Sequence, residues 1–193
     1  FLDRVVRILN AKPASEDGAS AAVWMLRVMR VKGAQLGAAL DALQQYHSDS
    51  EQLKSVMLSL SRNATPAVGL FLEKVSAAST SGEIRGRTSY ALAEHFKARA
   101  KMIRSLAMAD NKEVARLAGF LGRDVVDILK AEDPVAAEAK AAEWFESVIA
   151  NEQFAAIDYF RGTLGEHAER TLYELRNLSI GKVAPDIIGE DID

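Results

Sequence analysis

Cysteine is missing from all 193 residues of this sequence. Its absence excludes disulfides, thiolate metal sites, cysteine nucleophiles and thiol redox chemistry for this segment taken alone. The cellular compartment stays open, because a chain without cysteine fits reducing and oxidising surroundings equally well.

A strong charge of one sign is also missing. Lysine and arginine total 24 against 27 acidic residues, which gives a formal net charge of -3. Such a balance provides no general attraction to phosphate backbones or anionic lipid, so nucleic acid is not an expected partner. No apolar run reaches the roughly 18 residues that cross a bilayer, so we expect no transmembrane segment in this chain. Because the sequence begins at Phe1, the lack of a signal peptide carries no information.

Proline and glycine are scarce, with 4 and 12 copies, and apolar residues recur at helical spacing through most of the chain. This pattern predicts an all-α protein. Helix starts are predicted where a capping side chain precedes a carboxylate by three residues or precedes a proline. They fall at Ser48, Thr80, Asp110, Thr163, Thr65–Pro66 and Asp133–Pro134, and divide the chain into eight or nine helices.

Predicted caps at Ser20, Ser48, Thr80 and Asp110 lie about 30 residues apart, which indicates stacked helical hairpins. The stretch 83–96 resembles the second helix of HEAT repeats, and 141–152 resembles a tetratricopeptide helix. We therefore predict an irregular HEAT/TPR-like α-α superhelix over residues 1–180, followed by an extended tail over 181–193. The segment 20–32 is apolar around most of its circumference and is expected in the interior, contacted on both sides.

One predicted helix conflicts with its own pattern. In the helix that starts at Glu83, His95 and Arg99 project into the same sector as the apolar stripe. Two explanations are open: the pair meets acids across an interface, or the helix breaks near Ala98. We favour pairing.

No constellation in the sequence indicates catalysis. His47, His95 and His167 are far apart and match no zinc-binding or di-iron spacing. Carboxylates are plentiful, but none stands out as an acid/base pair, and no nucleophile elbow, phosphate loop or dinucleotide fingerprint occurs. We expect no catalytic, cofactor-binding or metal-binding residue in this segment.

The helix that starts at Glu83 also carries a local excess of positive charge. Lys97, Lys101 and Arg104 lie in one polar sector, opposite the apolar stripe. The sector is either a solvated face or a docking face for an acidic partner. The acidic end of the chain, which includes Asp186 and Asp193, is one candidate for that partner.

The C-terminal stretch "IGKVAPDIIGEDID" resembles the opening segment of thioredoxin-like redoxins of the TlpA/ResA and AhpC/TSA type. In that family Gly-x-x-Ala-Pro-Asp leads into the first β-hairpin of the redox domain, and here Gly181, Ala184, Pro185 and Asp186 match it. The role of these four residues is structural. The stretches 160–187 and 142–149 resemble the helical region that precedes such domains in some large bacterial redoxins.

The resemblance implies that residues 1–180 are a non-catalytic helical region of a thiol-disulfide oxidoreductase or peroxiredoxin-like protein. Its partners would be its own C-terminal thioredoxin-like domain, which starts at about residue 181, and the substrate proteins of that domain. By resemblance the whole protein would work outside the cytoplasm, periplasmic or tethered to a membrane. Two alternatives remain: a free-standing helical-repeat scaffold for protein interactions, and an unrecognised helical-bundle enzyme.

Overall fold

The computed structural model describes residues 1–178, and within that range the chain is all-α, as the sequence predicts. The described part contains no strand, only an isolated antiparallel bridge between Asp158 and Thr163. The α-helices are α1 Leu2–Ala11, α2 Glu16–Trp24, α3 Gly33–Tyr46, α4 Lys54–Ser61, α5 Pro66–Ala78, α6 Gly82–Met108, α7 Asn111–Leu121, α8 Arg123–Lys130, α9 Pro134–Ala150, α10 Glu152–Ala155 and α11 Leu164–Asn177. A π-helix η1 covers Met25–Met29, and a 3-10 turn η2 covers Glu51–Leu53.

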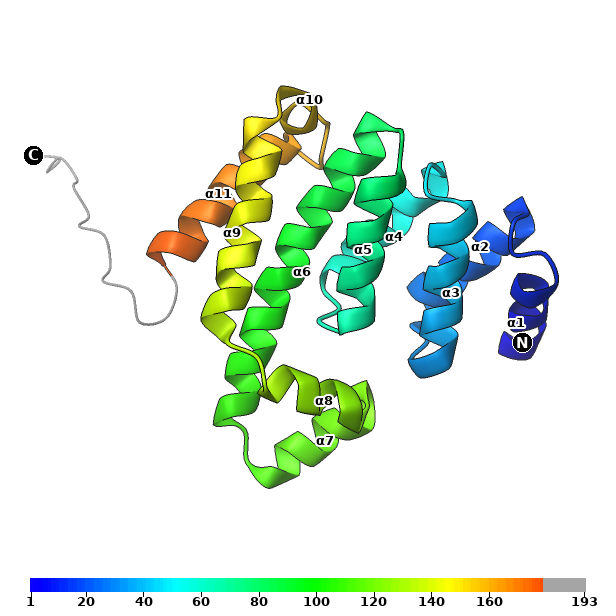
Figure 1. Ribbon diagram of the computed structural model, residues 1–193, viewed down its shortest axis with the longest axis horizontal. Coiled ribbons are helices and arrows are strands. Elements are labelled where there is room, and N and C mark those ends of the chain that lie inside the picture. The colour runs from blue at the N-terminus through cyan, green and yellow to red at the C-terminus, as the bar shows by residue number, and fades with distance from the viewer. Residues whose placement is uncertain (179–193) are drawn as a thin grey trace, which may run out of the picture.

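The helix α6, 27 residues long, is the centre of the molecule. The helices α5 and α9 lie along it on either side, and α11 packs on the outer side of α9 (Figure 1). Short turns join α5 to α6 and place the two antiparallel, while the pair α7 and α8 crosses the far end of α6. Helical hairpins are therefore present, and their winding into a HEAT/TPR-like superhelix stays a prediction.

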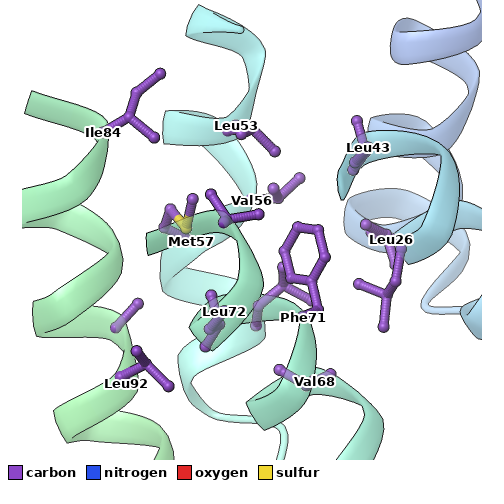
Figure 2. Close-up of a cluster of buried hydrophobic side chains, with 14 of the residues drawn as sticks. Leu26, Leu43, Leu53, Val56, Met57, Val68, Phe71, Leu72, Ile84 and Leu92 are labelled. Carbon is purple, nitrogen blue, oxygen red and sulfur yellow. The ribbon is translucent and has the colours of Figure 1, made fainter. Parts of the chain in front are cut away.

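The main core forms where six consecutive elements place their apolar faces together. Figure 2 shows Leu26 of η1 and Leu43 of α3 facing side chains from η2, α4, α5 and α6. The same core continues to the other side of α6, where Phe145 of α9 and Leu172 of α11 are buried. Because α6 contributes to both halves, it joins the N-terminal helices to the C-terminal ones.

A second, smaller core lies at the C-terminal end of α6. It consists of Ala100, Ile103, Leu106, Val126, Leu129 and Ala137, supplied by α6, α8 and α9. The helix α7 has no buried residue and packs only partly buried side chains onto this cluster. The pair α7 and α8 is therefore attached to the main body through α6 and α9.

The predicted helix starts at Thr65–Pro66, Asp110, Asp133–Pro134 and Thr163 are confirmed. Asp110 accepts a hydrogen bond from the amide of Glu113, and Thr163 forms a complete capping box with Glu166. The starts at Ser48 and Thr80 are wrong. Each hydroxyl is used elsewhere: Ser48 donates to the carbonyl of Gln44, 2.6 Å away, and Thr80 donates to Asp49, 2.8 Å away. The caps are Ser50 and Ser81 instead.

The expectation that 20–32 lies wholly in the interior is also wrong. Met25 and Leu26 are buried, but Val28 is 62% exposed and Met29 is 43% exposed. The reason is the π-helix, whose turn contains about one more residue than an α turn, so Val28 and Met29 leave the apolar face. Arg30, with φ 48°, then ends the helix in the left-handed conformation.

The predicted domain boundary and the tail 181–193, with Gly181, Ala184, Pro185 and Asp186, lie outside the described residues.

Candidate functional site

A groove runs over the middle of α6 between α5 and α9, with a volume of about 360 Å³. We call it the α5–α9 groove. It is lined by Pro66, Gly69, Leu70, Glu73, His95, Phe96, Arg99, Glu132, Asp133, Ala136, Ala137 and Lys140. The floor comes from α6, one wall from α5, and the other wall from the start of α9 and the turn before it.

Small side chains on both walls keep the groove open. Gly69 faces the floor from α5, and Ala136 and Ala137 face it from α9. Leu70, which is 53% exposed, adds an apolar edge on α5, and Phe96 is the apolar part of the floor. The space between the walls is therefore bordered largely by carbon.

His95 is the most deeply buried polar residue of the floor, only 1% exposed. Its Nδ1 lies 2.7 Å from the backbone carbonyl oxygen of Asn63, in the turn between α4 and α5. A carbonyl can only accept, so Nδ1 carries the proton and Nε2 carries a lone pair. Within residues 1–178, Nε2 has no hydrogen-bond partner.

The environment keeps this imidazole neutral. Burial, with a smaller effect of the Arg99 charge, lowers the pKa of His95 from 6.5 to about 4, although the bond to Asn63 and the charge of Glu132 act in the opposite direction. At neutral pH the floor of the groove therefore presents a hydrogen-bond acceptor and no imidazolium charge.

Arg99 lies one helical turn after His95 and is also buried. Its Nε donates to Glu132 at 2.6 Å, its Nη2 donates to the other oxygen of the same carboxylate, and its Nη1 donates to the carbonyl of Ala64 at 2.8 Å. The charge is thus paired, and the same side chain connects α6 to the α4–α5 turn and the α8–α9 turn.

These contacts resolve the conflict in the α6 pattern. The helix continues unbroken past Ala98, and Arg99 pairs with an acid across the interface, as we expect from the sequence. For His95 the expectation of an acidic partner is wrong, because the carbonyl of Asn63 occupies its Nδ1. A peptide carbonyl at a turn is an acceptor that a sequence pattern does not reveal.

Charges on the rim of the groove nearly balance. Glu73, Glu132 and Asp133 carry negative charge, and Arg99 and Lys140 carry positive charge. The Lys140 ammonium lies 5.4 Å from the centre of the Phe96 ring, so part of its field is directed onto an aromatic face. This balance does not favour a strongly charged ligand.

The predicted docking face lies outside this groove, on the polar side of α6. Lys97 pairs with Glu94 at 2.7 Å, and Arg104 forms a two-bond pair with Glu138 on α9. Lys101 is exposed and has no ion pair with any residue in 1–178. Two of the three charges are therefore neutralised locally, and the docking face stays a prediction.

No arrangement for catalysis or metal binding is visible in the described part of the chain. The groove lining contains no hydroxyl or thiol side chain, and no cluster of three metal-ligating residues occurs in 1–178. The histidines stay apart: His47 contacts the Pro13 carbonyl at 2.8 Å, and His167 packs edge-on against Tyr159. Within the same range, no helix is long and apolar enough to cross a membrane.

Comparison with protein families, curated proteins and solved structures finds no match to this chain. The groove must therefore be interpreted from its own residues.

The groove itself is not predicted by the sequence, because its walls are almost 70 residues apart in the chain. A signal for it exists in hindsight. His95 and Arg99 are polar residues on an apolar stripe, and Gly69 interrupts the apolar face of α5. Each of these irregularities lies in the groove.

Proposed function

We propose that residues 1–178 form a helical interaction domain that is itself non-catalytic and serves a thioredoxin-like redox domain. The observation that carries the interaction part is the α5–α9 groove, an open depression with apolar walls and a polar floor. Such a depression accepts side chains of a partner polypeptide, and its lining contains no hydroxyl or thiol nucleophile to act on them.

The redox part of the proposal is supported by the resemblance of Gly181, Ala184, Pro185 and Asp186 to the opening segment of redoxins. A helical domain next to a thiol-disulfide oxidoreductase or peroxiredoxin-like domain could position that domain or bind its substrate protein. By the same resemblance we propose an extracytoplasmic location. The alternative is a free-standing helical scaffold, which uses the same groove without a redox domain.

Random-peptide display against the 193-residue chain tests the interaction part. We expect enriched peptides whose affinity, measured by fluorescence anisotropy, falls at least about tenfold in Ala136→Arg, because the new side chain fills the groove. Ala139→Arg is the matched control: both alanines are exposed on α9, but Ala139 does not line the groove. Peptides that bind the two variants equally well, or a selection without enrichment, would contradict the proposal.

Sequencing the gene past the codon for Asp193 tests the redox part. The expected result is a coding sequence for a cysteine-bearing thioredoxin-like domain. A stop codon or an unrelated domain would refute the redoxin assignment, and it would leave the free-standing scaffold as the function that the groove supports.

A further inference from the structure

The Nε2 atom of His95 is an acceptor without a donor. The carbonyl of Asn63 fixes the proton on Nδ1, so Nε2 presents its lone pair, and no residue within 1–178 bonds to it. Nε2 is not fully enclosed, because the one fully buried side-chain polar atom without a partner in 1–178 is Oγ1 of Thr65, so water reaches Nε2 from the groove. A purely apolar ligand would displace that water without replacing its hydrogen bond, whereas a ligand that brings a donor replaces it. The floor of the groove is therefore better suited to a ligand with an N–H or O–H group than to a purely apolar one.

Because residue 69 on α5 is glycine, no side chain at this position packs against Nε2 of His95. A Cβ built on Gly69 would lie 2.8 Å from Nε2, closer than any real contact of this kind. Every other residue type at this position would place carbon against the nitrogen. The glycine thus lets the backbone of α5 pass close to the imidazole on α6 without placing a side chain against Nε2.

The surroundings of His95 restrict the body of the ligand. Leu70, Phe96 and Ala136 border the groove with carbon, so the part of a ligand above the nitrogen must be apolar. The charges of the lining nearly balance and Arg99 is paired with Glu132, so a strongly charged donor is not favoured. A volume of about 360 Å³ is at the lower end of the range for ligand sites and suits one or two large side chains.

We propose that the α5–α9 groove recognises an aromatic side chain that carries a hydrogen-bond donor, of the tyrosine or tryptophan class, and that Nε2 of His95 accepts its hydrogen bond. Tyrosine and tryptophan combine a large apolar ring with one neutral donor, and they are enriched among the residues that dominate protein interfaces. This inference rests on the proposed function, since it names what the groove binds.

Four small molecules test the inference on the 193-residue chain. The pairs are p-cresol with 4-methylanisole, and 3-methylindole with 1,3-dimethylindole, and within each pair a methyl group replaces the donor hydrogen. The imidazole nitrogen resonances of His95 are followed by NMR, with His47 and His167 as internal references. We expect p-cresol and 3-methylindole to shift the Nε2 resonance of His95 saturably, and the methylated partners to bind about tenfold more weakly.

Two variants separate this inference from the proposed function. Ala136→Arg should abolish binding of all four molecules, whereas Gly69→Ala, checked for folding by circular dichroism, should remove the preference for the donor. If the two molecules of each pair bind with equal affinity, and Ala136→Arg still abolishes their binding, the inference is overturned. The groove would then remain an interaction site that does not select for a hydrogen-bond donor. Groove-binding display peptides that contain neither tyrosine nor tryptophan would also overturn it.

Discussion

The guanidinium of Arg99 and the carboxylate of Glu132 form a two-bond ion pair that connects α6 to the turn between α8 and α9. A third bond of the same guanidinium reaches the carbonyl of Ala64, and His95 bonds the neighbouring carbonyl of Asn63. Two side chains one turn apart on α6 therefore fix the turns at which both walls of the groove begin. The geometry of the groove depends on this polar contact as well as on apolar packing.

Replacement of Glu132 by glutamine should destabilise the fold. The variant keeps the shape but leaves the guanidinium of Arg99, whose side chain is 7% exposed, without its counter-charge. Because the Glu132 side chain is 36% exposed, we expect a loss of about 2 kcal/mol, less than for a fully buried pair. Urea unfolding followed by circular dichroism measures it.

The control for this variant is Glu113→Gln. Glu113 forms a two-bond pair with Arg116, but both side chains are exposed to solvent, so we expect a much smaller loss of stability than in Glu132→Gln. Similar losses in Glu132→Gln and Glu113→Gln would show that the Arg99 pair contributes no more than a surface ion pair.

The stability of the protein should fall as the pH drops from about 6.5 to 4. The pKa of His95 is about 4 in the folded state because of burial and the nearby Arg99 charge, against 6.5 for the free group. The unfolded state therefore binds the proton first, so the contribution of His95 is complete above pH 6.5 and decreases towards pH 4. The total change is roughly 3 kcal/mol, measurable as the free energy of unfolding in urea across this range.

His95→Gln is the matched variant, since its amide can still donate to the Asn63 carbonyl and does not titrate. We expect its stability to change less between pH 6.5 and 4. Asp49 titrates separately, because hydrogen bonds from Ser79 and Thr80 lower its pKa to about 2, and its contribution disappears only below about pH 4. A His95 pKa of 6.5 or above in an NMR titration of the folded protein would contradict this prediction.

Local signals of the sequence predict local structure here. Asp110 and Thr163 cap the helices that their spacing predicts, because their side chains bond only within those helices. Ser48 and Thr80 have the same spacing and fail. The Ser48 hydroxyl donates to the carbonyl of Gln44, and Thr80 is bound by Asp49, about 30 residues away in the chain. The α5–α9 groove depends wholly on such long-range placement, so the sequence reveals only the irregular residues that line it.

Two glycine positions should respond to alanine in opposite directions. At Gly165 of α11 an added Cβ would lie 2.8 Å from the Cβ of Ala155 and 3.1 Å from its Cα. We expect Gly165→Ala to cost about 2 kcal/mol, because α10 and α11 must separate. At Gly119, within α7, an added Cβ meets nothing within 4 Å, so Gly119→Ala should stabilise by about 1 kcal/mol.

Thermal and urea unfolding of both glycine variants check this pair of predictions. Both substitutions remove a glycine from a helix, and only Gly165→Ala also introduces a close contact between α10 and α11, so the difference between the variants mainly reports that contact. Equal stabilisation of both variants would show that α11 does not approach α10 as closely as described.

Thr65 should tolerate valine better than Thr163, although both are threonines at helix N-caps. The hydroxyl of Thr65 is buried, makes no cap bond and is the one buried side-chain polar atom in 1–178 without a partner. Its replacement by the isosteric valine removes that cost, so we expect Thr65→Val to stabilise by about 1 kcal/mol. At Thr163 the hydroxyl accepts from the Glu166 amide, so Thr163→Val should destabilise by about 1 kcal/mol. Urea unfolding measures both variants, and an equal loss in the two would mean that the Thr65 hydroxyl is hydrogen-bonded in solution.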